Sequence, residues 1–308
     1  MTRQRKRHVV PGLLLLAIVF AAGCGSGGDN KDSSQAGLEL EEQLGFSQSG
    51  IIERQSRVEG VIRDCMKSQG FDYIPIDPYA QRAALTGKAR MSDEEFQKQF
   101  GYGISTLFGR GTEQSDPNDR IRKSLGPADR AAYDRALWGE NTGVTFAEAV
   151  DSDAIDQLGG CTKQATEKVF GGAATLSALK GKLDELDDRI LQDQRMVKAI
   201  DDWSQCMAEE GYRYSEPDEI DSDIQKRFES IVGVGVRPGA TVPPDSGTSY
   251  DKAALASLQQ DEVKIATADL KCEKQEITPV ESKVRPQYEA QFREQNRALL
   301  ARVKPIGG

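Results

Sequence analysis

Residues 65–73 read CMKSQGFDY, and residues 206–214 read CMAEEGYRY. Both stretches contain Cys-Met, a Gly four residues after the Met and a final Tyr, and an aromatic residue follows the Gly in each. A glycine just past a helix commonly adopts the left-handed conformation that ends the helix. The repeat therefore predicts two related halves, in each of which a helix ends soon after a cysteine and the chain leaves in an extended conformation.

The rest of the chain is typical of an all-α protein. Charged and apolar residues interleave at helical spacing, while strand-like alternation of Val, Ile and Thr is nearly absent. The clearest pattern predicts a bundle helix from about Ala174 to Glu210, in preference to an extended intermolecular coiled coil, because Asp193 interrupts its apolar stripe and Gly181 weakens it. The stripe consists of Leu176, Leu179, Leu183, Leu186, Ile190, Val197, Ile200 and Met207.

Further helices are expected on both sides of this stripe. Pro127 and Gly139 mark the start and the end of one of them, since proline suits the first helical turn and glycine the position after the last. The expected ranges are about 38 or 51 to 66, 92–100, 127–138, a helix that carries Cys161, 219–231, 250–274 and 279–303, with a Gly/Pro-rich loop at 233–248.

The N-terminus has the pattern of an export signal. The first eight residues carry four basic side chains, and residues 9–22 are almost wholly apolar. This run is shorter than the roughly 20 residues that a membrane-spanning helix needs. The sequence AAGC at 21–24, followed by the polar, Gly/Ser-rich residues 25–37, resembles a bacterial lipoprotein signal, although Ala21 stands where such signals usually have Leu.

That resemblance implies cleavage before Cys24, acylation of Cys24 (palmitate among the acyl chains) and attachment to the extracytoplasmic face of the cell membrane. The alternative is an ordinary secreted protein in which Cys24 is a free or intermolecularly paired thiol. An odd number of cysteines weighs against the alternative, because lipidation of Cys24 leaves an even number for disulfides.

Composition excludes several classes of function. The signal holds four of the 40 basic residues and no acid, so the mature chain would carry 36 basic and 49 acidic side chains, a formal charge of −13. We therefore expect no binding to nucleic acid. The only histidine is His8, inside the signal. Histidine-dependent nucleophilic catalysis and His-ligated metal sites are excluded, and we expect neither a cofactor nor a metal.

Four cysteines remain for disulfides and allow three pairings. We favour Cys65 with Cys161 and Cys206 with Cys272, because each bond then links a repeated helix end to a later helix of its own half. The pairings 65–206 with 161–272, and 65–272 with 161–206, would connect the halves and leave each one without an internal link. A redox role is not expected, since the four cysteines form no Cys-x-x-Cys pair.

The glycine-rich loop GYGISTLFGRG at 101–111 invites comparison with phosphate-binding loops. It lacks the Lys-Ser/Thr ending of a P-loop and follows no predicted strand. A structural or partner-facing loop is the better interpretation, with Tyr102, Phe108 and Arg110 as exposed candidate interaction residues.

Acidic residues raise two further alternatives. The clusters at 151–156 and 218–223 lack the Gly and terminal Glu of a calcium-binding EF-hand loop, so we interpret them as helix starts. Glu262 and Asp269 fall on the cysteine's face of their predicted helix and should be buried. They indicate either an acidic pocket for a cation or a sugar, or, as we prefer, a structural role in which Asp269 accepts a hydrogen bond from Tyr214 or a helix terminus.

Several motifs together give the chain a family resemblance. They are the lipoprotein signal, the two Cys-Met repeats, FGYGIST at 100–106, SLGPADRAAYDRALWG at 124–139, GGC at 159–161 and E-x2-IATADLKC at 262–272. With them the chain resembles a group of helical, disulfide-containing actinobacterial lipoproteins. The resemblance implies location and fold, and it supplies no catalytic residues to carry over.

The predicted organisation is a signal peptide at 1–23, a flexible tether at 24–37, a first helical half at 38–172 and a second at 173–308. We expect a non-enzymatic binding or structural module of the cell envelope that contacts an envelope protein or a cell-wall component. The alternative is a carboxylate-dependent cell-wall glycan hydrolase, which needs a deep cleft with two facing acids. A solute-binding protein is disfavoured, because it would need strands.

Overall fold

The computed structural model describes residues 40, 44, 48–110, 117–140, 157–233 and 250–303, and every regular element within them is helical. The predicted all-α fold is confirmed. In chain order the helices are α2 (Gln48–Ser68), α3 (Pro78–Thr86), α4 (Asp93–Phe100), α5 (Pro117–Ser124), α6 (Pro127–Trp138), α8 (Gly160–Phe170), α9 (Ala173–Leu191), α10 (Gln194–Glu209), α11 (Asp218–Val232), α12 (Lys252–Cys272), the π-helical turn η2 (Glu273–Ile277), α13 (Thr278–Gln295) and α14 (Arg297–Leu300).

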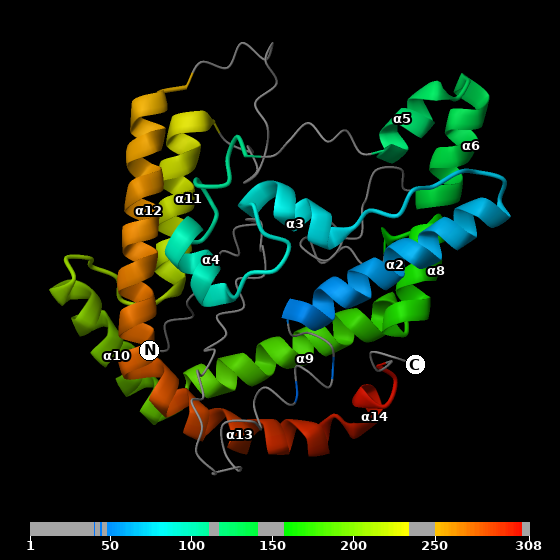
Figure 1. Ribbon diagram of the computed structural model, residues 1–308. Helices are drawn as coiled ribbons and strands as arrows, with labels where there is room; N and C mark the ends of the chain where they lie inside the picture. Colours follow the sequence, from blue (N-terminus) through cyan, green and yellow to red (C-terminus); the bar gives the residue numbers. More distant parts are fainter. Residues whose placement is uncertain are drawn as a thin grey trace, which may run out of the picture.

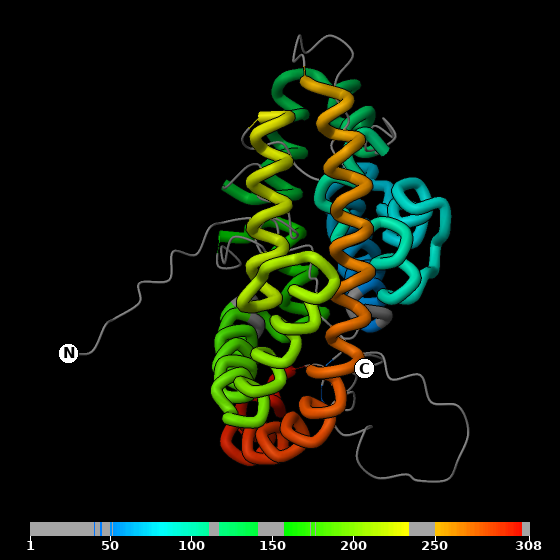
Figure 2. The backbone as a smooth tube through the Cα atoms, turned by 90° about the vertical axis from the view of Figure 1, so that its left-hand side faces the viewer, coloured from blue at the N-terminus to red at the C-terminus, as the bar shows by residue number. Residues whose placement is uncertain are grey.

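The helices are arranged as a horseshoe with two arms (Figure 1). One arm consists of α11 and α12, and the other of α2, α5, α6 and α8. Along the base, α9 and α13 pack side by side. Helices α3 and α4 lie between the arms: α3 packs on α2, and α4 packs on α12. Figure 2 shows α11 on one side of α12 and the α3–α4 segment on the other.

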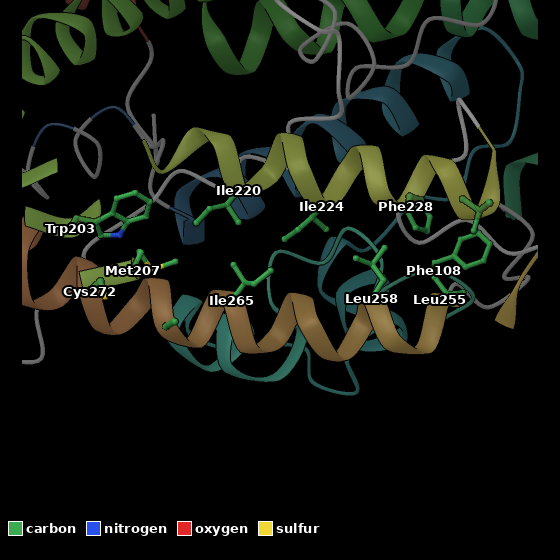
Figure 3. Close-up of a cluster of buried hydrophobic side chains, with 12 residues drawn as sticks. Phe108, Trp203, Met207, Ile220, Ile224, Phe228, Leu255, Leu258, Ile265 and Cys272 are labelled. Atoms are coloured by element: carbon green, nitrogen blue, oxygen red, sulfur yellow. The ribbon is translucent and has the colours of Figure 1, made fainter. Parts of the chain in front are cut away.

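Each arm has its own apolar core, and a third core lies at the base. The core of the first arm contains Val58, Ile62, Met66, Tyr133, Ala136, Leu137, Leu158, Cys161, Ala165, Val169 and Phe170. The second core lies between α11 and α12, with Phe108 near one end and Trp203, Met207 and Cys272 at the other (Figure 3). The base core contains Leu40, Leu44, Leu179, Leu186, Ile190, Met196, Val284 and Phe292.

The packing crosses the predicted division into halves at 172/173. Leu40 and Leu44 precede the first arm in sequence, yet they are buried in the base core with side chains of α9 and α13. Helix α4 also belongs to the first half of the sequence, and it packs on α12 of the second. The two halves are therefore related in sequence, but residues of the first half pack against helices of the second.

The two Cys-Met repeats end their helices in the same way. Gly70 and Gly211 both have positive φ angles, 85° and 94°. The amide of Phe71 donates to the carbonyl oxygen of Met66 at 3.0 Å, and the equivalent bond in the second copy measures 2.9 Å. These bonds satisfy carbonyl groups that a helix end would otherwise leave unpaired. The glycine angles and these bonds confirm the predicted helix ends. Both methionines are fully buried.

The disulfides follow the predicted pairing within each half. Cys65 is bonded to Cys161 and Cys206 to Cys272, with Cα–Cα distances of 5.6 Å and 5.7 Å. The first bond joins the end of α2 to the start of α8, and the second joins the end of α10 to the end of α12. The pairings that would have connected the two halves are not formed.

The single helix predicted from Ala174 to Glu210 is instead two helices. The chain turns between α9 and α10 at Asp193, which has extended backbone angles and whose carboxylate accepts a hydrogen bond from the amide of Arg195. A cap of this kind starts a new helix and resets the phase of its apolar stripe. Val197, predicted to be in the stripe, is 47% exposed, and the buried face of α10 consists of Met196, Ala199, Trp203 and Met207.

The other predicted helices are present, with two differences. The predicted 250–274 and 279–303 ranges correspond to α12 and α13, joined by the π-helical turn and followed by α14. Helices α3 and α5 were not expected. Of the predicted 233–248 loop, only Gly233 lies among the described residues.

Candidate functional site

The segment from Met91 to Arg110 contains the predicted interaction residues, and it is less exposed than expected. Phe108 is only 7% exposed and is part of the second arm's core. Its ring centroid lies 5.3 Å from that of Phe228 and 5.5 Å from that of Tyr250, both edge-on. The expectation of an exposed Phe108 is therefore wrong, because the loop folds onto α11 and α12 and places its aromatic ring in their core.

Tyr102 is also directed inward. It packs against the same core, and its hydroxyl donates to Asp269 Oδ2 at 2.6 Å. Arg110 is exposed as predicted, but its guanidinium lies 4.9 Å from the ring centroid of Phe100, and its Nε donates to the carbonyl oxygen of Thr106. Tyr102 and Phe108, two of the three predicted interaction residues, thus hold the loop in place by packing into the core.

Glu262 is the residue around which the loop is built. Its carboxylate accepts the amides of Ile104 and Ser105, both at 2.8 Å, and that of Thr106 at 3.3 Å. The hydroxyl of Ser105 donates to the same carboxylate at 2.5 Å. A Cβ at Gly101 would touch the Glu262 side chain, so the close approach requires glycine there. The loop does surround an anion with backbone amides, and that anion is a carboxylate of the same chain.

Asp269 is held by side chains from two other elements. Trp203 Nε1 donates to its Oδ1 at 2.9 Å, and Gln97 Nε2 reaches its Oδ2 at 3.5 Å, beside the Tyr102 hydroxyl. The preferred structural interpretation of this residue is supported, but the predicted donor was wrong. Tyr214 donates instead to Asp223 of α11 at 3.1 Å.

Further acids lie near Glu262 and Asp269. Burial raises the pKa of both Glu262 and Asp269, although their hydrogen bonds act in the opposite direction. Burial, together with the charges of Asp269 and Glu281, raises the pKa of Glu273 to about 9. Asp221 is exposed at the start of α11, and partial desolvation, followed by nearby acids of which Asp218 has the largest effect, raises its pKa to about 6. Some of these carboxyl groups therefore hold protons near neutral pH.

Solvent access decides what the pair of acids can do chemically. Glu262 is 0% exposed and Asp269 2% exposed, and both carboxylates are occupied by donors of the protein itself. A hydrolytic acid must reach both its substrate and water. The arrangement instead supports a purely structural use of the two acids, as acceptors that fix the loop on α12.

The acidic cluster at 218–223 lies at the start of α11, as predicted. Asp218, Glu219 and Asp221 are in its first turn, where negative charge complements the helix dipole. The N-cap position itself is Pro217, which offers no side-chain acceptor, and Glu219 accepts the amide of Ser215 at 2.7 Å. The cluster at 151–156 and the proposed lipidation site, Cys24, lie outside the described residues.

Glu273 was missed, although the sequence contains a signal for it. The repeat extends to the partner cysteines, which read CTKQ at 161–164 and CEKQ at 272–275. This alignment pairs Glu273 with Thr162, a buried residue whose hydroxyl donates to the carbonyl oxygen of Leu137 at 2.9 Å. The sequence alone supplies this alignment, and the burial of Thr162 in the structure is what makes it indicate a buried acid at Glu273. Gln97, Ser105 and Trp203 had no such signal.

Two further findings concern the described residues alone. No three or more His, Cys, Asp or Glu side chains are grouped there as a metal ion would require. No helix among them is long and apolar enough to cross a bilayer.

Comparison of the chain with protein-family models, with curated proteins and with solved structures finds no match. Conclusions about function therefore depend on the residues and the geometry described above.

Proposed function

We propose that the protein is a membrane-anchored extracytoplasmic lipoprotein, attached through Cys24, whose helical body is a non-enzymatic binding or structural module of the cell envelope. The carrying observation is the cysteine arrangement. Four of the five cysteines form two disulfides within the body, and Cys24 is the one left over. Disulfides persist in oxidising compartments, and the leftover cysteine is the one that follows the export signal.

The structure supports the non-enzymatic part of the proposal through its buried acids. The hydrolase alternative needs two accessible carboxyl groups, whereas Glu262 and Asp269 are sealed and hydrogen-bonded inside the second arm. Within the described part of the chain, no observation favours the hydrolase. We keep the resemblance to actinobacterial lipoproteins as part of the proposal, with an envelope protein or a cell-wall component as the partner.

Replacement of the anchor residue tests the location. The variant Cys24→Ser, expressed in a bacterial host that processes lipoproteins, should move from the membrane fraction to the soluble extracytoplasmic fraction, because a hydroxyl cannot take the thioether-linked lipid. The control Ser26→Ala changes a neighbouring tether residue and should remain with the membrane. An unmodified Cys24 in membrane-bound wild-type protein, measured by mass spectrometry, would contradict the anchor.

Two assays separate the binding module from the hydrolase. The lipidated full-length protein, cross-linked in intact cells, should retain an envelope protein or sediment with purified cell-wall material. The same protein, incubated with purified wall glycan, should release no reducing ends. A release of reducing ends that depends on the protein would reverse the ranking of the two functions.

A further inference from the structure

The segment 91–110 has an apolar core of its own. Met91, Phe100 and Leu107 are buried together, with Phe96 packed against them, and all four side chains come from this one segment. The rings of Phe96 and Phe100 are 5.4 Å apart. Two glycines in the turn that follows α4 have positive φ angles, Gly101 and Gly103. The segment is thus a compact unit of one helix and the glycine-rich turns that follow it.

This unit is fastened mainly to the opposite half of the chain. Besides the bonds to Glu262 and Asp269, Gln259 Nε2 donates to the carbonyl oxygen of Ser105 at 2.9 Å. At the other end of the segment, Glu94 pairs with Lys274 at 2.7 Å. Toward the first half, Arg82 of α3 donates to the carbonyl oxygen of Met91 at 3.3 Å, and α3 packs on α2. The segment therefore connects the two arms on the side away from the base.

The described contacts that attach the segment to the second half are largely polar. Their largest apolar contribution is the ring of Phe108, with Tyr102 and Ile104 only partly buried. The polar contributions come from bonds to two carboxylates, each of which loses solvation on burial. A hydrogen bond inside a protein contributes on the order of 1 kcal/mol net, because water replaces it when it breaks. Detachment of the segment should therefore cost less free energy than unfolding of either arm.

We propose that residues 91–110 form a detachable strap. It fastens the two arms by seating on α12, with Glu262 as its main anchor, and it is released as a unit while both disulfide-linked cores stay folded. Release removes this connection between the arms, which stay joined through the base, and it uncovers the Phe228 and Tyr250 rings, which Phe108 covers in the attached state. The strap is a conformational device that does not depend on the function proposed above.

Hydrogen exchange of the intact, oxidised full-length protein tests the strap. In the wild type, the protected amides of 93–108 should share one opening rate, at least about tenfold faster than the opening of the amides of α2, α8 and α12. Exchange of the strap at the same rate as those helices would overturn the proposal, because the segment would then open only on global unfolding. This comparison requires no variant.

The variant Glu262→Leu tests the anchor. It removes the acceptor of three amides and one hydroxyl while it keeps an apolar side chain of similar size, so exchange of the strap should accelerate about tenfold or more. Exchange in α2 and α8 should not change. The control Thr267→Ala lies on the exposed face of α12 and should leave the strap as in the wild type. Equal acceleration everywhere, or none in the strap, would overturn the role of Glu262.

Discussion

Glu289 on α13 is 1% exposed, and neither of its carboxylate oxygens accepts a hydrogen bond within the described part of the chain. Its neighbouring cations form long ion pairs with it, beyond hydrogen-bond distance: Arg293 lies at 3.8 Å and Arg285 at 4.0 Å. Burial is the main reason that the pKa of Glu289 rises to about 7, with the two arginines opposing the shift and Asp187 and Glu281 adding to it. The folded protein thus binds a proton at this position more tightly than the unfolded chain does.

This shift predicts a stability that decreases as the pH rises. The ordinary pKa of 4.5 is raised to about 7, so the contribution of Glu289 is fully present below about pH 4.5 and is lost as the pH rises through 7. The variant Glu289→Gln cannot lose a proton, and at pH 8 its free energy of unfolding should exceed that of the wild type by about 3 kcal/mol.

Urea denaturation at pH 5 and pH 8 checks this prediction. The stability difference between Glu289→Gln and the wild type should be small at pH 5 and should appear at pH 8. The exposed neighbour Glu294 provides the control Glu294→Gln, for which no such change with pH is expected. A difference that is the same at both pH values would contradict the raised pKa.

Contacts of individual buried polar side chains are the features that the sequence predicts least well. Arg54 is buried in the first arm, where it donates to the carbonyl oxygens of Val169 and Leu44 at 3.0 Å and 2.7 Å. Nothing in its sequence neighbourhood distinguishes it from an exposed helical arginine. Likewise, Tyr102 and Asp269 are 167 residues apart in the chain, and no local pattern links them.

At the scale of helices, local signals predicted the structure well where they were used. Helix α6 has the predicted bounds, because Pro127 suits its first turn and Gly139 its end. Helix α3 was missed despite similar signals, an Asp77 N-cap, Pro78 and Gly87. Asp193 interrupts the apolar stripe of the single helix predicted from Ala174 to Glu210. An acid at such an interruption equally predicts the start of a new helix, and this is what the structure has.

The junction between α6 and α8 has no room for a side chain at Gly160. Gly160, the first residue of α8, has a φ of 54° and lies against the last turn of α6, where a Cβ would overlap the carbonyl oxygen of Ala136. The variant Gly160→Ala combines an unfavourable backbone conformation with this clash. It should lower the free energy of unfolding by about 2 kcal/mol or more.

Gly60→Ala is the matched control for this junction. Gly60 is inside α2, and a Cβ there would meet no atom within 4 Å. Alanine is the better helix former, so this variant should gain about 0.5–1 kcal/mol. Urea midpoints of both variants, measured against the wild type, decide the matter: similar midpoints for the two would show that the junction tolerates a side chain.

For the whole molecule, the helical spacing of apolar residues predicted the class of fold, and the repeat together with the cysteine count predicted the pairing of the disulfides. They were not enough to predict that α4 packs on α12. The reason is physical: an internal repeat specifies what each copy resembles, whereas the contacts between copies depend on side chains that only one copy has, such as Asp269, which aligns with Leu158 of the first copy.

The two disulfides should contribute almost equally to stability. They span 96 and 66 residues, and the chain-entropy model gives about 4.7 and about 4.4 kcal/mol for loops of these lengths. The double variants Cys65→Ala/Cys161→Ala and Cys206→Ala/Cys272→Ala should therefore each lose about 4 to 5 kcal/mol of the free energy of unfolding. Urea denaturation measures both, with Cys24→Ser as the control that keeps both bonds. An unchanged midpoint in either double variant would contradict the predicted contribution of its bond.

The two disulfides also determine how the chain would respond to a pulling force. Each bond closes a covalent ring, so tension applied to the two ends of the body passes through the sulfur atoms and bypasses the residues inside the ring. The segment 91–110 lies inside the first ring, 65–161, and its backbone would stay slack while the rest of the chain is drawn out. Reduction of that one bond would release 96 residues into the path of the force, about 300 Å of additional length.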